Sequence, residues 1–176
     1  METLTVNGTS YEILQLLGHG KGGYSYLVQR DGQQYVLKQI HHEPCDYYTF
    51  GNKIEAEHTD YIRLTNAGIP IPTMYQIDIQ QERILKEYIP GPTIYTLVKE
   101  DRVLPEYFDQ VRSMAHQAQQ AGLNIDYFPT NFVVCNDLLY YVDYECNLYD
   151  PKWNFENWGI KYWSKTAAFI EYMRSH

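Results

Sequence analysis

The chain changes character at the segment Pro90-Gly91-Pro92. Before this break, short runs rich in leucine, aromatic and β-branched residues predict strands, and after it longer amphipathic runs predict helices. This pattern favours an α+β fold with a β-rich part at 1–90 and a mostly helical part at 91–176. The expected strands are 11–17, 24–28, 34–40, 75–79 and 83–88, followed by a hairpin at 132–135 and 138–142; the expected helices are 104–121 and a helix or helix pair at 155–173.

Local signals refine the β-rich part. Asp31-Gly32 lies between two expected strands and predicts a tight hairpin. Between Cys45 and Asn66 the period changes, because apolar residues there recur at helical spacing, and Gly68 then predicts the end of a helix. We therefore expect one helix within the first ninety residues.

Composition excludes several classes of function. The formal net charge is −8 and no run of lysine or arginine occurs, so a nucleic-acid partner is not expected. No apolar stretch is long enough to span a bilayer, and the first residues lack the basic and apolar regions of a signal peptide. The three cysteines, Cys45, Cys135 and Cys146, show no metal-type spacing. We expect a cytoplasmic protein with no membrane partner.

The chain is also rich in tyrosine, with 18 residues of this type. Tyrosine combines an apolar ring with a polar hydroxyl, so these side chains are expected mainly to pack with the hydroxyl in water. A surface that stacks ligands is the alternative interpretation.

A glycine-rich segment, Gly18-His-Gly20-Lys-Gly-Gly23, separates the first two expected strands. Glycines allow backbone N–H groups to approach phosphates closely. The segment is not a dinucleotide fingerprint, because a strand rather than a helix follows it, and it lacks the Gly-Lys-Ser/Thr of a P-loop. A glycine-rich hairpin loop without a ligand has the same sequence pattern.

Lys38 lies in the third expected strand, and Glu57 follows it by nineteen residues on the expected helix. A carboxylate at this place can pair with the ammonium and direct it toward phosphates. Glu55 is a competing partner, but Glu57 shares a helical face with Tyr61 and Leu64. The alternatives are an exposed strand lysine and solvated glutamates.

The segment Asp126-Tyr-Phe-Pro-Thr-Asn131 is followed by the expected hairpin and then by Asp143. In phosphoryl transfer one carboxylate orients the acceptor hydroxyl, while an amide oxygen and a second carboxylate hold Mg²⁺. Taken singly, each of these residues is also typical of a turn cap.

Together these motifs resemble the protein-kinase-like superfamily, and most closely its compact atypical bacterial members, similar to RIO-type kinases and aminoglycoside phosphotransferases. The resemblance runs from Gly18 to about Asp150, and includes Ala67-Gly-Ile-Pro-Ile-Pro72 and Asp143-Tyr-Glu145. It implies a bilobal fold: an antiparallel β-sheet N-lobe with one αC-type helix at 1–90, and a minimal, mostly helical C-lobe at 91–176.

The resemblance also implies ATP and Mg²⁺ as cofactors and a role for each matching position. The implied roles are phosphate cover for Gly18, Gly20 and Gly23, contact with the α- and β-phosphates for Lys38 paired with Glu57, an adenine-binding backbone hinge from Glu87 to Ile89, a catalytic aspartate in Asp126, and magnesium ligation by Asn131 and Asp143.

Two departures from the family qualify these expectations. Asn124-Ile125 stands where protein kinases have His-Arg, so no switch by activation-loop phosphorylation is expected. The C-lobe is short and carries an aromatic and acidic segment at 146–158. Its aromatic residues Trp153, Phe155 and Trp158 are expected to anchor the core; alternatively, acidic and amide residues of 145–156 select the acceptor.

The expected function is an ATP- and Mg²⁺-dependent phosphotransferase, either an atypical serine/threonine-type kinase or a small-molecule kinase. It would bind a nucleotide and pass the γ-phosphoryl group to a hydroxyl of a protein or small molecule. The first alternative is a weakly active or inactive pseudokinase-like scaffold that binds nucleotide. The second is a structural domain that binds no nucleotide.

Overall fold

The computed structural model describes residues 2–20, 22–42 and 52–176. The chain divides into two compact units. The first comprises Met1–Thr59 and Pro72–Tyr88, and the second comprises Asp60–Ile71 and Ile89–His176. The first seven residues of the expected helix at 45–66 lie outside the described part of the chain, as does Cys45.

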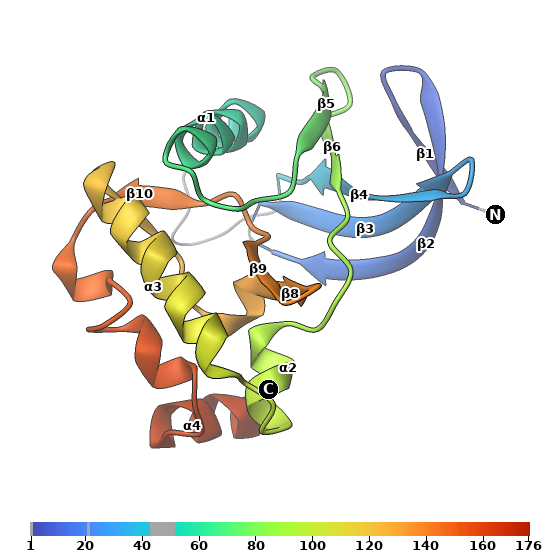
Figure 1. Cartoon of the computed structure of the whole chain (residues 1–176). Helices are drawn as coiled ribbons and strands as arrows, with labels where there is room; N and C mark the ends of the chain where they lie inside the picture. The colour runs from blue at the N-terminus through green and yellow to red at the C-terminus, as the bar shows by residue number, and fades with distance from the viewer. Residues whose placement is uncertain (1, 21, 43–51) are drawn as a thin grey trace. The chain divides into compact units, whose positions relative to one another are not determined.

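An antiparallel sheet of six strands dominates the first unit (Figure 1), in the order β1-β2-β3-β4-β6-β5. Its strands are β1 (Thr3–Val6), β2 (Thr9–His19), β3 (Gly23–Arg30), β4 (Gln33–Ile40), β5 (Met74–Asp78) and β6 (Arg83–Glu87). Two-residue turns connect β1 to β2 and β3 to β4, at Asn7-Gly8 and Asp31-Gly32. All four turn residues have φ between 48° and 83°, the left-handed conformation that tight hairpin turns require.

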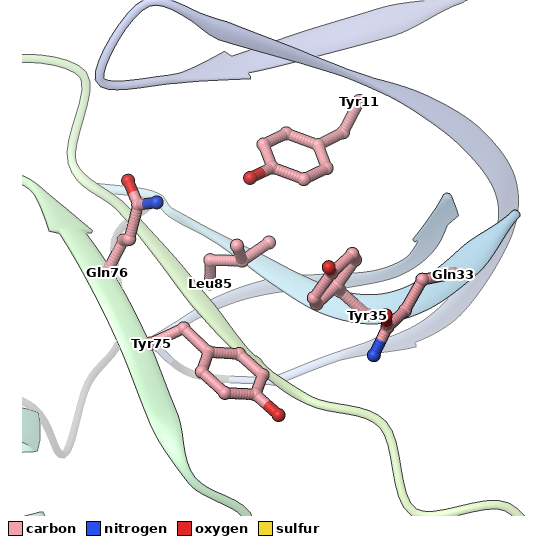
Figure 2. A pocket seen from close by; sticks show the side chains of 6 residues that line it. All are labelled: Tyr11, Gln33, Tyr35, Tyr75, Gln76 and Leu85. Carbon is pink, nitrogen blue, oxygen red and sulfur yellow. The ribbon is translucent and has the colours of Figure 1, made fainter. Parts of the chain in front are cut away.

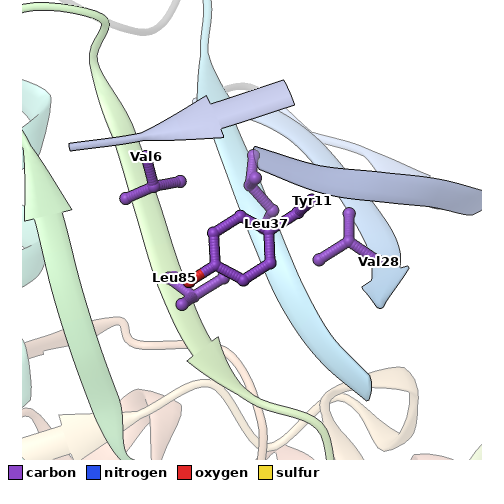
Figure 3. Packing of buried hydrophobic residues seen from close by; sticks show 5 residues of the cluster. All are labelled: Val6, Tyr11, Val28, Leu37 and Leu85. Atoms are coloured by element: carbon purple, nitrogen blue, oxygen red, sulfur yellow. The ribbon is translucent and has the colours of Figure 1, made fainter. Parts of the chain in front are cut away.

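The sheet curls around a hydrophobic core formed on its inner face (Figure 3). The buried members of this core are Val6, Tyr11, Val28, Leu37 and Leu85, from five different strands. Side chains also connect β1, at one edge of the sheet, with β5 and β6 at the other edge. Asp78 Oδ2 at the end of β5 accepts a hydrogen bond of 2.8 Å from the backbone N–H of Asn7, and Arg83 Nη1 donates to Thr5 O at 2.8 Å.

Helix α1 (Lys53–Asn66) supplies apolar contacts to the other face of the sheet. Ile54 of the helix packs with Ile40 of β4 and Ile84 of β6 in a second buried cluster. Because strand side chains alternate between faces, Ile84 lies on the face opposite Leu85. Glu57 follows Ile54 by three residues, so it is directed toward the same face of the sheet.

The second unit combines short helices with two small antiparallel sheets. Its strands pair as β7 (Leu123–Ile125) with β10 (Cys146–Leu148), and β8 (Phe132–Cys135) with β9 (Leu138–Tyr141). Its helical segments are α2 (Ile94–Lys99), α3 (Pro105–Gln120), α4 (Ala167–Ser175) and the 3-10 turns η1 (Pro129–Asn131), η2 (Pro151–Trp153) and η3 (Gly159–Tyr162). Asn136 and Asp137, both at positive φ, form the turn between β8 and β9.

Aromatic side chains form the core of this unit. Trp163 is fully buried against Phe132 and Phe155, with ring centroids at 5.2 and 5.4 Å, and its indole N–H donates to Tyr127 O at 2.8 Å. Of the three anchors expected from the sequence, Phe155 is buried, whereas Trp153 is 48% exposed. Trp163, which the sequence pattern did not single out, is the central residue instead.

The structure is α+β, but the prediction of a bilobal protein-kinase-like fold is wrong. The mostly β topology, with one curled six-stranded sheet and four α-helices in the described part of the chain, is not that fold. In the second unit the hairpin expected at 132–135 and 138–142 is present as β8 and β9, whereas β7 and β10 were not predicted. Residues 155–173, expected as a helix or helix pair, contain only η3 and most of the nine-residue α4.

The structure describes two features on which the predictions from composition depend: the lengths of the helices and the state of two of the cysteines. The longest described helix, α3, has 16 residues, and none of the helices in this part of the chain is apolar and long enough to cross a bilayer. Cys135 and Cys146 are free thiols. Burial, and then the Asp60 carboxylate that accepts a hydrogen bond from Cys146 Sγ, raise the pKa of the Cys146 thiol to about 12.

Candidate functional site

In the glycine-rich segment, Gly18 belongs to β2 and Gly23 to β3, and Gly20 and Gly22 lie in the turn between them. Gly20 N–H donates to Gly23 O at 2.9 Å, and a His41 ring nitrogen lies 2.8 Å from Gly20 O. Gly18 and Gly20 are exposed, with open space where a Cβ would stand, whereas a Cβ on Gly23 would lie 2.5 Å from Gln39 O. Gly23 is therefore required for close packing of β3 on β4, and Gly18 and Gly20 are the glycines that a ligand can approach.

Strand register places two lysines on one face of the sheet. Lys38 lies opposite Ile84 across the β4–β6 pair, and Lys86 lies opposite Val36. Since Val36 and Lys38 are two residues apart on β4, the two lysines are diagonal neighbours on the face that carries Ile84. Lys38 was predicted from the sequence, whereas Lys86 was not. The signal available for Lys86 was its spacing of two from Ile84, which places it on the buried face of the strand.

Glu57 of α1 bonds to both lysines. Its Oε1 accepts a hydrogen bond from Lys38 Nζ, and its Oε2 lies 3.5 Å from Lys86 Nζ. The side chains of Glu57 and Lys86 are each 6% exposed, and that of Lys38 is 16% exposed. Glu55 is exposed, and its backbone N–H bonds to Asn52 Oδ1. Glu57, rather than Glu55, is therefore the partner of Lys38.

The electrostatics of the cluster keep this carboxylate ionised. Burial alone would raise the pKa of Glu57, but the charges of Lys86 and Lys38 and their hydrogen bonds outweigh burial and hold the pKa below its usual value of 4.5. A buried carboxylate that stays charged fixes the positions of both ammonium groups.

The ammonium of Lys38 lies close to the glycine-rich turn. Its Nζ is 3.9 Å from the position that a Cβ on Gly22 would occupy. Glycine at this position thus leaves room directly beside a lysine that is held in place from behind by Glu57. Backbone N–H groups, open glycines and an oriented ammonium are the groups that bind phosphates in proteins.

In the second unit, the loop after β7 brings Asp126 and Asn131 together. Asp126 Oδ1 accepts a hydrogen bond of 3.1 Å from Phe128 N–H, and Asn131 Nδ2 donates to Asp126 O at 3.3 Å. Asn131 O in turn accepts from Val142 N–H at 2.9 Å, which places Asn131 beside the segment that carries Asp143. The three polar residues predicted from the sequence therefore lie in one region of this unit.

Tyr141, which was not predicted from the sequence, holds this region together. Its side chain is fully buried; its hydroxyl accepts from Asp126 N–H at 3.2 Å and donates to Glu145 O at 2.7 Å. Burial, and then the nearby charge of Asp143, hold the pKa of the Tyr141 hydroxyl well above its usual value. The available signal was the alternation of Leu139 and Tyr141 on β9, which places both on the buried face.

The second region offers oxygen ligands for a cation. The amide nitrogen of Asn131 donates into the loop, so its Oδ1 remains an acceptor, and the Asp143 carboxylate has no hydrogen bond to another residue in the described part of the chain. Mg²⁺ is commonly held by one or two protein oxygens together with phosphates and water. These two residues fit that pattern, although no group of three or more His, Cys, Asp or Glu in the same part of the chain forms a complete metal site.

The remaining predicted positions are the hinge residues Glu87 and Ile89. Glu87 N–H donates to Thr73 O at 2.8 Å, and Glu87 Oε1 accepts from Thr73 N–H at 3.0 Å. That N–H is thus engaged within the first unit, while Ile89 is buried and belongs to the second. The structure groups the glycines with Lys38 and Glu57 in one unit, and Asp126, Asn131 and Asp143 in the other.

Comparison with known proteins returns no match: no protein-family model and no curated protein matches the chain.

Proposed function

We propose that the protein binds ATP with Mg²⁺ and transfers the γ-phosphoryl group to a hydroxyl acceptor. The observation that carries the proposal is the position of Lys38: its ammonium is bonded to the buried Glu57 carboxylate and lies beside the turn formed by Gly20, Gly22 and Gly23. An exposed strand lysine, the alternative expected for this residue type, would show neither feature.

In this proposal, the first unit binds phosphates. The Lys38 ammonium neutralises charge on the phosphate oxygens, and the absence of a Cβ at Gly18 and Gly20 lets the phosphates approach the chain closely. Glu57 acts as a positioning residue: it holds the ammonium in one place, so the Lys38 side chain loses little conformational entropy when the nucleotide binds.

The second unit provides the groups for transfer. Asn131 Oδ1 and the Asp143 carboxylate would hold Mg²⁺, which would supply charge neutralisation to a phosphate. The Asp126 carboxylate orients the acceptor hydroxyl and accepts its proton as the new oxygen–phosphorus bond forms; the bond between the β,γ-bridging oxygen and the γ-phosphorus breaks, and ADP leaves. We also propose a cytoplasmic location, where ATP is available and the free Cys135 and Cys146 thiols remain reduced.

A second candidate function is nucleotide binding without transfer. It is favoured by one specific contact: Asp126 Oδ1 accepts the backbone N–H of Phe128, which is the geometry of a turn cap. If this contact is the whole role of Asp126, the protein is a nucleotide-binding module that regulates a partner.

Two measurements on the full chain separate these functions. Calorimetric titration with a non-hydrolysable ATP analogue, with and without Mg²⁺, should show binding in wild type and about tenfold or greater weakening in Lys38→Met. Lys99→Met, at an exposed lysine of α2, is the matched control and should bind as wild type does. Absence of analogue binding to wild type under either condition would overturn the proposal.

Release of ADP from ATP then tests transfer. With a panel of hydroxyl compounds and protein acceptors, Asp126→Asn should lower turnover at least a hundredfold while leaving analogue binding intact. Binding that is normal in both proteins, with no turnover in wild type, would favour the nucleotide-binding module instead.

A further inference from the structure

A hollow of about 380 Å³ opens on the inner side of the curled sheet (Figure 2). The residues that line it are Tyr11, Gln33, Tyr35, Tyr75, Gln76 and Leu85, from β2, β4, β5 and β6. Leu85 lies between Ile84 and Lys86 on β6, so alternation places the hollow on the face opposite the Lys38–Glu57–Lys86 cluster. It is therefore a separate site from the proposed phosphate-binding region.

Tyrosine rings and one leucine form the apolar part of the hollow. Tyr35 contacts Tyr11 and Tyr75 edge to face, with ring centroids at 5.6 and 5.8 Å and interplanar angles of 81° and 84°. Leu85, which is 2% exposed, lies among the three rings in Figure 2. Tyr75, by contrast, is 46% exposed, so the ring on β5 is accessible from outside.

The polar groups of the hollow have few partners within the protein. The hydroxyls of Tyr11, Tyr35 and Tyr75, and the amide of Gln33, form no hydrogen bond with any residue that the structure describes. Gln76 Oε1 accepts from Asn7 Nδ2 at 3.2 Å, which leaves the Gln76 amide N–H groups available.

The Tyr11 hydroxyl is open to the hollow even though the residue is 5% exposed. Asn124 Oδ1 is the one buried side-chain nitrogen or oxygen atom in the described part of the chain that has no hydrogen-bond partner. The Tyr11 hydroxyl is not among such buried atoms, so it can be reached from the hollow and is available to a ligand.

The lining is uncharged. Burial raises the pKa of Tyr11 and of Tyr75, so both hydroxyls remain neutral at physiological pH. A phosphorylated or carboxylated ligand would need a cation in the lining to offset its desolvation, and no Lys, Arg or His lines the hollow. A neutral ligand with many hydrogen-bonding groups is the chemistry that remains.

We propose that this hollow is a binding site for a neutral carbohydrate. Sugar hydroxyls both donate and accept hydrogen bonds, as do tyrosine hydroxyls and the carboxamides of Gln33 and Gln76. The C–H face of a sugar ring packs on aromatic rings, and Tyr11, Tyr35 and Tyr75 supply them. A hollow of this volume is at the small end of the range for ligand sites, about 300–1,000 Å³, and accommodates one or two sugar rings.

Saturation-transfer NMR tests the proposal on the full chain with three probes: D-glucose, maltose and cellobiose at concentrations up to about 20 mM. Saturation of at least one sugar by the protein is expected, with a dissociation constant on the order of 1 mM. If none of the three sugars receives saturation, the proposal is wrong.

Variants locate the binding. Tyr75→Phe removes one hydroxyl from an exposed ring, and Gln33→Ala removes one exposed amide, so neither change perturbs the core. Each should weaken binding of the sugar about fivefold, whereas Tyr140→Phe, at a tyrosine of the second unit, should not. Sugar binding that is unaffected by both Tyr75→Phe and Gln33→Ala would overturn the assignment to this hollow.

One further variant and one counter-probe test the assignment of the ligand and of the site. Lys38→Met should leave sugar binding unchanged, because the hollow is on the other face of the sheet; this result supports the proposal whether or not the protein binds ATP. Tetramethylammonium chloride is the counter-probe, since three tyrosine rings can also hold a cation. Saturation of tetramethylammonium without saturation of any sugar would replace the carbohydrate assignment with a cation site.

Discussion

Glu57 Oε2 lies 3.5 Å from Lys86 Nζ, on the side of the carboxylate away from the oxygen that bonds Lys38. Helix α1 is thereby tied to two neighbouring strands, β4 and β6, by one buried side chain. Lys38 therefore has a fixed position that depends on a second lysine as well as on its direct partner.

Replacement of Glu57 should destabilise the first unit. Glu57→Gln removes the negative charge between two lysines, Lys86 being the more buried of them, and should lower the free energy of unfolding by about 3 kcal/mol. Urea unfolding followed by circular dichroism measures the change. Glu55→Gln, at an exposed position two residues away, is the control and should stay within about 0.5 kcal/mol of wild type. Equal effects of the two variants would contradict a specific role for Glu57.

The same carboxylate predicts a dependence on pH. Because the pKa of Glu57 is lower in the folded than in the unfolded state, its ionised form stabilises the fold at every pH above the usual value of 4.5. This contribution decreases as the pH falls below 4.5 and through the folded pKa. The difference in unfolding free energy between wild type and Glu57→Gln should therefore be constant from pH 7 to pH 5 and smaller at pH 3. A difference that grows toward low pH would contradict the direction of the shift.

Asp78 should stabilise the closure of the curled sheet. Its two carboxylate oxygens accept hydrogen bonds from Asn7 N–H at 2.8 Å and from Gln81 N–H at 3.0 Å. Asp78→Ala should therefore cost about 2 kcal/mol and should speed hydrogen exchange at the Asn7 amide. Asp109→Ala, at an exposed position of α3, should do neither. Unchanged exchange at Asn7 would show that this bond does not protect the end of the sheet.

The glycines of the β2–β3 turn should differ sharply in their tolerance of alanine. A Cβ at Gly23 would lie 2.5 Å from the backbone oxygen of Gln39, so Gly23→Ala should force β3 and β4 apart and cost about 2 kcal/mol or more. Gly20→Ala meets open space and should leave stability within about 0.5 kcal/mol of wild type. Thermal unfolding of both variants checks this, and a stable Gly23→Ala protein would contradict the close approach of the two strands.

Tyr141 should position the second group of polar residues. Tyr141→Phe keeps the buried ring but removes the hydroxyl that bonds Asp126 N–H and Glu145 O, and should cost about 2 kcal/mol. If Asp143 and Asn131 hold Mg²⁺, the variant should also need more Mg²⁺ to bind the ATP analogue. Tyr140→Phe, next to it on β9, is the control. A loss of stability with an unchanged requirement for Mg²⁺ would leave Tyr141 with a structural role alone.

The elements predicted correctly from the sequence are those set by local signals. Asp31-Gly32 predicts its hairpin because the turn itself requires positive φ, and the helix expected at 104–121 is α3, Pro105–Gln120. Strand β1 was missed, although Asn7-Gly8 between Val6 and Thr9 is the same kind of signal. Its short length, four residues, hides it in a search for longer strand patterns.

The features that the sequence could not predict depend on long-range pairing. Lys86 reaches Glu57 only because β6 pairs with β4 as well as with β5, its neighbour in sequence. Strands β7 and β10, which were not predicted, pair across more than twenty residues. Neither register is encoded in a local pattern, which is why the individual strands and the pair Lys38–Glu57 were easier to predict than the fold.

The tryptophans of the chain lie in one of the two units, so fluorescence can follow the unfolding of that unit separately. All three tryptophans of the chain, Trp153, Trp158 and Trp163, lie in the second unit, and Trp163 is the largest of its fully buried side chains. Tryptophan emission thus reports on that unit alone, whereas tyrosines lie in both units and their emission reports on the whole chain. Unfolding curves recorded by tryptophan and by tyrosine emission will coincide if the two units unfold in one cooperative transition. They will differ if each unit has its own transition.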